Sequence, residues 1–318
     1  MRKSVRVITS KETRIQFTEL FNSLISLEDI NLLTDNQYSH NSLLAMRKDW
    51  NLFVDFCLSK SVCPLPASTT AVRLFLQRES KQRKYATLKR YGVTISLVHK
   101  LLSYSDPTSS TVVRTLLAQL RLDKKQDATV TTAFSRKHLE KLTQKLIHST
   151  HPVDIRNLAI YYLMLECMLK RSELKQLFYE QLIIDKNSVH VQLGNERYTL
   201  SSCAHQLLEK WLQLRGLDAG VLFTAIDKHG NLSRIPLDDS SIYRILRTAS
   251  DKLKLNVQFS GQSLRVGAVA DMADKGVKVK DIQHFGRWQS AAMPYQYIGN
   301  RTQAAVERMV FKKFKPWD

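Results

Sequence analysis

The chain has 318 residues, and its 48 Lys and Arg against 29 Asp and Glu give a formal net charge of +19 at pH 7. A hydrophobic fraction of 43% with only 10 Gly and 7 Pro excludes a disordered, collagen-like or loop-rich β chain. No apolar run approaches the ~18 residues of a membrane span, so we expect no membrane partner. This length suggests about two domains of roughly 100–200 residues each. A sequence pI of about 9.8 favours a polyanionic partner, most often nucleic acid.

The four cysteines stand at positions 57, 63, 167 and 203, and their spacing is not that of a metal site. We expect buried, reduced thiols, as in a cytoplasmic protein, and no bound metal. The first residues are basic, but no long apolar run follows them, so the sequence does not predict a secretory signal.

Apolar side chains at helical spacing predict a helical domain over residues 1–125. Four stretches carry the apolar stripes, at residues 43–57, 72–76, 88–102 and 112–120. Residues 2–16 look too polar to pack, and we expect a loose arm there. The polar stretch 126–133 has no helical period and is the predicted linker.

A second domain is predicted over residues 134–318. Residues 155–169 are apolar nearly all round, which predicts a buried helix. The one clear strand signal lies near 182–200, where apolar and polar residues alternate around a turn at Gly194. Further helices are predicted at residues 203–215, 238–253, 262–275 and 278–285. We therefore expect a mainly α protein, with an all-helical domain followed by a mostly helical one that holds a small antiparallel sheet.

Basic residues cluster between positions 78 and 90, on the predicted helical domain. A charge cluster is usually only a solvated face, so it decides nothing by itself. Together with two basic residues of the stretch 43–57, this cluster supplies our candidate DNA-binding residues: Lys84, Lys89, Arg90, Arg47 and Lys48.

The most informative segment runs from Ser260 to Ala268, continues through Asp281–Trp288 and ends at Tyr295–Asn300. It resembles the C-terminal signature of Cre-like tyrosine recombinases. In that family a His-x-x-Arg-Val-Gly-Ala helix is followed by Gly-x-Trp and, nine residues past the Trp, by Tyr-Ile-x-Asn. Upstream stretches around residues 39–53 and 154–174 also resemble the family, so the likeness covers about residues 38–311.

The resemblance implies an N-terminal helical core-binding (SAM-like) domain and an α+β catalytic domain. It implies a site-specific recombinase that cuts and rejoins DNA through a 3′-phosphotyrosine, without a metal or cofactor. The expected partners are double-stranded DNA with an inverted-repeat site and further copies of the chain, two on each site and four in the synapse. The expected location is the bacterial cytoplasm or nucleoid.

Four positions match the family residue by residue. Tyr297 falls on the nucleophile, nine residues after Trp288, which falls on the His/Trp position. Arg265 falls on the second arginine, whose planar fork can bind two phosphate oxygens. Glu173 falls on the acidic residue three after the first arginine. Tyr295 is the competing nucleophile, and the spacing disfavours it.

Three positions depart from the family pattern. The first arginine position holds Lys170, and the neighbouring Arg171 is expected to point elsewhere because one residue turns a helix by ~100°. The lysine of the β-turn falls on Arg197, whose pKa is too high for a proton donor. The histidine before Arg265 is Gln262, which can hydrogen-bond but cannot titrate.

Losing one transition-state contact typically costs ~2.7–4 kcal/mol. The three departures therefore suggest an alternative function, a catalytically impaired DNA-binding protein that acts as an accessory or regulatory partner in recombination. A further alternative is that His284, four residues before Trp288, replaces the missing histidine.

Overall fold

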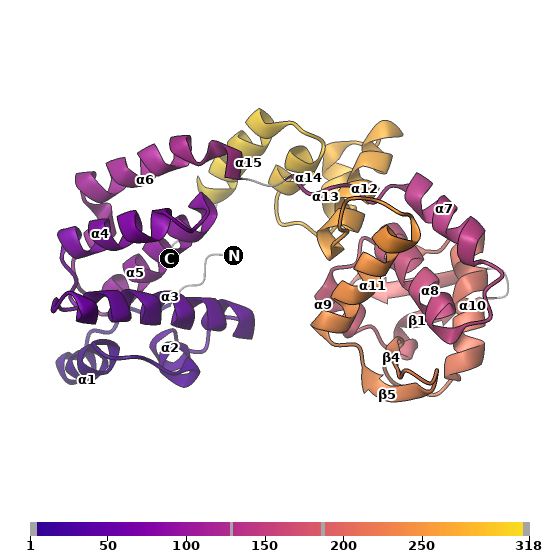
Figure 1. Cartoon of the computed structure of the whole chain (residues 1–318), viewed down its shortest axis with the longest axis horizontal. Coiled ribbons are helices and arrows are strands. Elements are labelled where there is room, and N and C mark those ends of the chain that lie inside the picture. Colours follow the sequence, from indigo (N-terminus) through magenta and orange to yellow (C-terminus); the bar gives the residue numbers. More distant parts are fainter. Residues whose placement is uncertain (1–4, 128–129, 186–187, 314–318) are drawn as a thin grey trace. The chain divides into compact units, whose positions relative to one another are not determined.

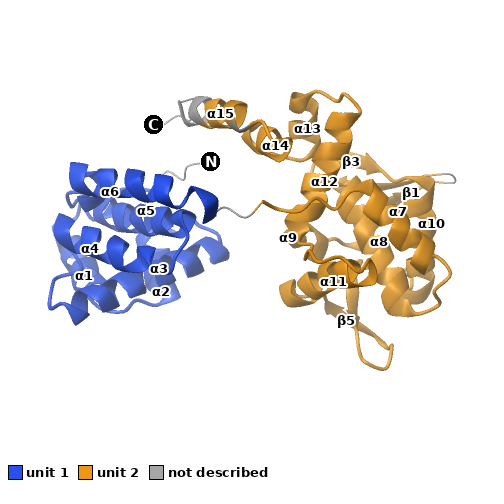
Figure 2. Ribbon diagram, turned by 45° about the horizontal axis from the view of Figure 1, so that its top comes forward, with its two compact units in different colours: residues 1–129, 315–318 blue, residues 130–314 orange. Residues whose placement is uncertain are grey.

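The structure is a computed structural model, and it describes residues 5–127, 130–185 and 188–313 (Figure 1). Within the last helix, nothing is described of the side chains of residues 301 and 309–313. The chain divides into two compact units, whose described residues are 5–127 and 130–313 (Figure 2). The division falls inside the predicted linker, and the limits of the two domains, 1–125 and 134–318, stay a prediction.

The described part of unit 1 is helical throughout. Its elements are α1 (Lys11–Phe21), α2 (Leu27–Leu33), α3 (His40–Ser59), α4 (Thr69–Ser80), α5 (Tyr85–Leu101), η1 (Pro107–Ser109), α6 (Thr111–Asp123) and η2 (Lys125–Asp127), where η marks a 3₁₀ helix. Serine side chains cap the N-termini of several of these helices. The Ser68 hydroxyl, for example, accepts a hydrogen bond from the amide of Ala71 at 3.1 Å. The core forms around the fully buried Trp50, whose indole nitrogen donates to the Phe21 carbonyl at 3.1 Å.

The prediction of a loose arm over residues 2–16 is wrong for the residues described. Helix α1 begins at Lys11, and the side chain of Ser10 accepts from the amide of Thr13. The amide of Ile8 donates to the Leu101 carbonyl at 2.8 Å. Ile8 and Phe17 pack against the core, so a few apolar side chains anchor a segment that is polar on average.

The expectation of four buried thiols is also only half right. Cys57 and Cys167 are buried, Cys203 is half-buried and Cys63 is exposed. The sulfur of Cys63 lies 3.2 Å from the carbonyl oxygen of Leu65. Burial of the Cys57 thiol, with a smaller effect of Cys63, raises its pKa to about 12, so this cysteine stays a packing residue.

Unit 2 combines helices with two small antiparallel sheets. Its elements are α7 (Arg136–Leu146), α8 (Pro152–Glu166), α9 (Arg171–Lys175), η3 (Tyr179–Gln181), β1 (Leu182–Ile184), β2 (Val189–Leu193), β3 (Glu196–Thr199), α10 (Ser202–Arg215), β4 (Thr224–Ile226), β5 (Leu232–Pro236), α11 (Asp239–Lys252), α12 (Gly261–Asp274), α13 (Val279–Phe285), α14 (Ala292–Tyr297) and α15 (Arg301–Lys313). The mainly α class is confirmed, and the predicted helices agree with α10 to α13 within about one residue.

The strand signal near 182–200 corresponds to a three-stranded sheet in the order β1-β2-β3, with Val191 opposite Tyr198. Gly194 takes a φ of +61° at the tight turn between β2 and β3, a conformation that favours glycine. The prediction of a single sheet is wrong, because β4 and β5 form a second, two-stranded one. The three-residue β4 and the largely exposed β5 show no apolar alternation that could have revealed them.

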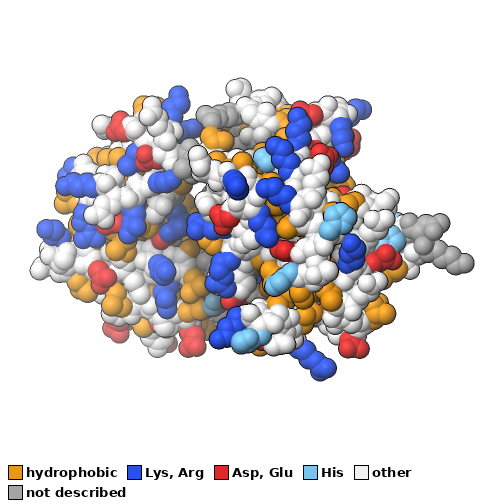
Figure 3. Space-filling model, turned by 45° about the vertical axis from the view of Figure 1, so that its right-hand side comes forward, with side chains coloured by type: hydrophobic (Ala, Val, Ile, Leu, Met, Phe, Trp, Pro, Cys, Tyr) orange, Lys and Arg blue, Asp and Glu red, His pale blue; other side chains and the backbone are white. Residues whose placement is uncertain are grey.

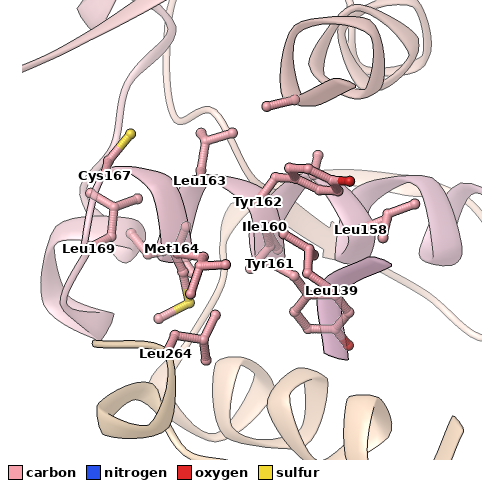
Figure 4. Packing of buried hydrophobic residues seen from close by; sticks show 14 of the residues in the cluster. Leu139, Leu158, Ile160, Tyr161, Tyr162, Leu163, Met164, Cys167, Leu169 and Leu264 are labelled. Carbon is pink, nitrogen blue, oxygen red and sulfur yellow. The ribbon is translucent and has the colours of Figure 1, made fainter. Parts of the chain in front are cut away.

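Helix α8 is the core of unit 2. Its residues from Arg156 to Leu165 are all buried, as the apolar run predicts. Figure 4 shows the side chains of Leu158, Ile160 and Met164 pointing to different sides of this helix, with Leu264 of α12 next to Met164. Helices α7, α10 and α12 pack on α8, so α12 carries Arg265 on a rigid support.

Gly267, two residues after Arg265, has a packing role. A Cβ atom at this position would overlap the backbone carbonyl of Phe134. The Phe134 amide in turn donates to the Ser263 carbonyl at 2.9 Å. The glycine therefore lets the segment that enters unit 2 lie directly on α12.

We expect the substitution Gly267→Ala to destabilise unit 2, because the neighbour is backbone and cannot rotate away. Overpacking of this kind costs about 1–3 kcal/mol. The control is Gly92→Ala in α5, where a Cβ would meet only Leu117 at 3.8 Å. Alanine in a helix interior is favoured there by about 0.5–1 kcal/mol. Thermal unfolding of both variants checks the difference, and equal stability of Gly267→Ala and the unmodified chain would contradict the packing role.

Candidate active site

Arg265 projects from α12 and is 5% exposed. Its Nη1 donates to the Met168 carbonyl and its Nη2 to the Gly286 carbonyl at 2.6 Å. Burial, and then the nearby charge of Arg287, lower the pKa of Arg265. A guanidinium has five N–H donors. Among the described residues the Nε of Arg265 has no hydrogen-bond partner, so donors remain for an anionic ligand.

Trp288 and Tyr297 lie beside this arginine. The guanidinium carbon of Arg265 is 4.1 Å from the centroid of the Trp288 ring. The rings of Trp288 and Tyr297 meet edge to face, with centroids 5.9 Å apart. A Cβ at Gly286 would overlap the Trp288 indole, so the glycine of the Gly-x-Trp pattern makes room for the ring to fold back.

Gln262 contacts the predicted nucleophile. Its Nε2 donates to the Tyr297 hydroxyl at 3.1 Å. Both residues lie at helix ends, Gln262 in the first turn of α12 and Tyr297 as the last residue of α14. The structure therefore gathers Arg265, Trp288, Tyr297 and Gln262 from α12, α14 and the connection between α13 and α14.

The neighbours of Tyr297 fit this arrangement. Pro294 stands in the first turn of α14, where a backbone N–H has no partner within the helix anyway. The Tyr295 side chain makes no hydrogen bond to the described residues, whereas the Tyr297 hydroxyl accepts from Gln262 and its ring packs on Trp288. His284 is exposed on α13.

Lys170 is engaged by Glu173. It precedes α9, its amide donates to one Glu173 oxygen at 2.8 Å and its Nζ to the other at 3.0 Å. Arg171, which the helical rotation predicts to point away from the Lys170 side chain, is exposed at the first position of α9. Its side chain runs against Gly261, where a Cβ would come within 2.6 Å of its Cγ. The Arg171 side chain thus lies against the start of α12, and its guanidinium has no hydrogen bond or ion pair to the described residues.

Arg197 does not join this cluster. It lies on β3 next to Tyr198, and successive residues of a strand point to opposite faces. Tyr198 is buried and donates its hydroxyl to the Phe285 carbonyl at 2.6 Å. Arg197 is half-exposed on the other face, with its Nη2 3.4 Å from a carboxylate oxygen of Asp185.

The sequence interpretation missed Arg287. Its Nη2 lies 2.8 Å from one Glu173 oxygen and its Nε 3.3 Å from the other. Burial alone would raise the pKa of Glu173, but the hydrogen bonds from Arg287 and Lys170 outweigh it and lower the pKa to about 2. For Arg287, burial is likewise outweighed by Glu173, and its pKa is raised. Arg287 occupies the variable position of the Gly-x-Trp pattern. Because that pattern does not specify a residue type there, it could not predict a buried arginine.

The candidate DNA-binding residues of unit 1 differ in their surroundings. Lys48, Lys84 and Lys89 are exposed, and Arg47 is half-buried. Arg90 is already paired, since two of its nitrogens lie 2.8 Å from the oxygens of the buried Asp49. The Arg90 side chain is still half-exposed, and its role in DNA binding stays a prediction.

Two adjoining hollows in unit 1 gather basic residues, of which the sequence analysis had singled out only Lys84. They lie where the start of α5 faces α6 and η2, and their charged lining residues are together Lys84, Arg114, Arg121, Lys124, Lys125 and Asp127. Figure 3 shows Lys and Arg side chains across the whole face drawn, with fewer Asp and Glu between them. The basic surplus of the composition is therefore displayed at the surface.

The ion pair of Glu173 has a pH dependence. Its stabilising effect is fully present above the ordinary carboxyl pKa of 4.5 and is lost as the pH falls toward about 2. We expect Glu173→Gln to lower the free energy of unfolding at pH 7 and to flatten its fall between these pH values. Denaturant unfolding at a series of pH values checks this, with the exposed Glu140→Gln of α7 as the control. A Glu173→Gln profile with the same acid slope as the unmodified chain would contradict the assignment.

In the residues that the structure describes, no group of three or more His, Cys, Asp or Glu side chains could hold a metal ion. No described helix is long and apolar enough to cross a membrane. The site described above is thus built from arginine, tryptophan, tyrosine and glutamine side chains.

Comparison with known proteins shows which family the chain resembles. The phage integrase family matches residues 132–304. An integrase/recombinase XerD homolog of Selenomonas ruminantium is 26% identical over 283 residues, which cover 81% of each chain. The recombinase Cre of Escherichia phage P1 is 24% identical over 288 residues, 79% of this chain and 83% of the relative.

Solved structures share the fold. The Tn1549 transposon integrase in complex with circular intermediate DNA has a TM-score of 0.64 at 14% identity, covering 92% of this chain and 99% of that one. XerH bound to palindromic difH substrate, in a post-cleavage complex, has a TM-score of 0.63 at 13% identity, covering 98% and 91%. With the family match over more than half of its length, the chain belongs to the phage integrase family of tyrosine recombinases.

Proposed function

We propose that this chain recombines DNA at specific sites with Tyr297 as its nucleophile. The phenol oxygen of Tyr297 attacks the scissile phosphorus, a phosphorus–tyrosine bond forms, and the bond to the 5′ oxygen breaks. The phenol gives up a proton and the departing 5′ oxygen takes one up. A 5′-hydroxyl of another strand then reverses the step. The observation that carries the proposal is the gathering of Tyr297, Arg265 and Trp288, with Gln262 on the reacting hydroxyl.

Arg265 and Trp288 supply the donors for the phosphate. The Nε of Arg265 and the indole nitrogen of Trp288 have no hydrogen-bond partner among the described residues, and the two side chains are stacked at 4.1 Å. Donors fixed in advance stabilise charge that develops on the non-bridging oxygens without the cost of reorganisation. Both residues therefore have the chemistry to bind the transition state.

Gln262 acts on the nucleophile itself. It donates to the Tyr297 oxygen at 3.1 Å and so can hold that oxygen in place and stabilise a phenolate. An amide cannot accept the proton at neutral pH. Another base, such as water, must take it, and this distinguishes the chain from family members that carry histidine here.

We assign the second guanidinium to Arg171 in place of Lys170. Lys170 contacts Glu173 through both its amide and its Nζ, whereas the Arg171 side chain extends along Gly261 at the start of α12. Only Arg171 offers a bidentate fork for a phosphate. Arg197 is paired with Asp185 and stays a candidate for the role of the family lysine.

The partner is DNA, as family membership indicates. We propose a double-stranded site with inverted repeats, bound by two copies of the chain, and a synapse of four copies in the bacterial cytoplasm or nucleoid. The lambda integrase structure, with a TM-score of 0.60, is a dimer bound to a core site, which supports two copies on one site. The exposed Lys48, Lys84 and Lys89 of unit 1 would contact phosphates, so binding should weaken steeply with salt.

The first test uses duplexes taken from the DNA that borders the gene, each nicked at a successive position so that a cut fragment is lost. We expect a covalent protein–DNA adduct on a denaturing gel, and none with Tyr297→Phe, which lacks the attacking oxygen. Tyr295→Phe is the matched control and should still form the adduct. If every duplex binds in a salt-sensitive way but none is trapped, the accessory DNA-binding function replaces this proposal.

The same duplexes separate the two basic residues before Glu173. We expect Arg171→Ala to slow adduct formation by ~10²–10³-fold, the usual loss of one transition-state donor. Lys170→Ala should slow it much less, because the Lys170 side chain faces Glu173. The reverse order of effects would show that Lys170 itself binds the phosphate.

A further inference from the structure

Arg287 lies in an unusual backbone conformation. Its φ is +56°, in the left-handed region that residues with a side chain rarely adopt. Met168, whose carbonyl it contacts, has a φ of +47°. Strained residues of this kind cluster where the surrounding structure holds them for a function. Both residues lie close to the candidate active site in sequence: Met168 is two residues before Lys170, and Arg287 comes directly before Trp288.

The guanidinium of Arg287 ties separate parts of unit 2 together. Its Nη1 donates to the Cys167 carbonyl at 3.1 Å and also to the Tyr198 hydroxyl. Its Nη2 donates to the Met168 carbonyl at 3.0 Å and to Glu173. It therefore links the end of α8, helix α9 and strand β3 to the connection between α13 and α14.

These contacts leave no donor of Arg287 for DNA. Each of its three nitrogens is bonded to protein oxygen atoms, and its side chain is only 15% exposed. The charge of the guanidinium is offset by Glu173 at 2.8 Å. Arg265 differs, because it makes no ion pair and its Nε is without a protein partner among the described residues. The two arginines thus have different tasks.

Arg287 controls the acceptors that hold Arg265. Both arginines donate to the Met168 carbonyl. The second acceptor of Arg265 is the carbonyl of Gly286, at 2.6 Å, and Gly286 is the residue directly before Arg287. Trp288, directly after it, stacks on Arg265 and packs against Tyr297. Movement of Arg287 would therefore shift both anchors of Arg265 and the indole.

We propose that Arg287 is a positioning residue: its buried guanidinium, paired with Glu173, fixes Arg265 and Trp288 for the scissile phosphate without contacting that phosphate. The proposal rests on the function proposed above. The candidate active site then contains an arginine, Arg287, that acts through Arg265 and does not contact DNA itself.

The test has one arm without DNA, so that it stands apart from the proposed function. The chain has four tryptophans, and fluorotryptophan labelling gives each a ¹⁹F resonance, with that of Trp288 assigned by its loss in Trp288→Phe. We expect Arg287→Met to move the Trp288 resonance and to leave that of Trp50, in unit 1, unchanged. Arg247→Met, at an exposed arginine of α11, is the control and should move neither.

The second arm measures adduct formation on the nicked duplexes. We expect Arg287→Met to slow it by about 10²-fold, as for a small misplacement of reacting groups, at an unchanged DNA affinity. Arg287→Lys should recover only part of the rate, because an ammonium cannot span the same acceptors. A duplex with an uncharged methylphosphonate at the cleaved position needs no cation to bind a phosphate charge. On this duplex the rate of Arg265→Ala should approach that of the unmodified chain, whereas the rate of Arg287→Met should stay below it.

The outcomes decide between positioning and direct binding. An unmoved Trp288 resonance in Arg287→Met overturns the proposal, and so does recovery of this variant on the methylphosphonate. If Arg287→Met does not fold because Glu173 is left unpaired, the double variant Glu173→Gln, Arg287→Met removes both charges and is measured in its place. If the unmodified chain forms no adduct, the proposed function fails, and the ¹⁹F arm alone decides whether Arg287 positions Trp288.

Discussion

The carbonyl oxygen of Met168 is the acceptor on which the candidate site depends. The guanidinium groups of Arg265 and Arg287 both donate to it, although two like charges repel more strongly in a buried environment than in water. Glu173 makes this approach possible, because its carboxylate lies against Arg287 and offsets one of the two charges. The charge of Arg265 then remains uncompensated at a buried position, which is the electrostatic requirement for binding a phosphate.

Spacing identified the parts of this site that lie in a continuous pattern. Arg265, Trp288 and Tyr297 follow one another at family intervals, and the structure brings all three together. The helical class and the apolar helix α8 were also predictable, because periodicity reports directly on burial. Gln262 was recognised only as a missing histidine, and its hydrogen bond to Tyr297 depends on how α12 and α14 pack.

Features that depend on tertiary packing could not be predicted from the sequence. A helical wheel places Arg171 about 100° from Lys170, but it does not show that Gly261 leaves room for the arginine chain. The pairing of Arg90 with Asp49 joins residues on two helices, so a count of basic residues overstates the free charge of unit 1. The hairpin of β4 and β5 is too short and too exposed to show an alternating pattern.

The departure at the first arginine position, Lys170, is connected with Arg287 through Glu173. One Glu173 oxygen accepts from the Nζ of Lys170 and the Nε of Arg287, and the other from the Lys170 amide and the Nη2 of Arg287. A carboxylate offers about four lone-pair sites, so it is saturated. A second planar fork at position 170 would compete with Arg287 for the same oxygens, whereas the flexible ammonium of lysine shares them. Lysine at 170 and arginine at 287 thus form one compatible arrangement around the Glu173 carboxylate.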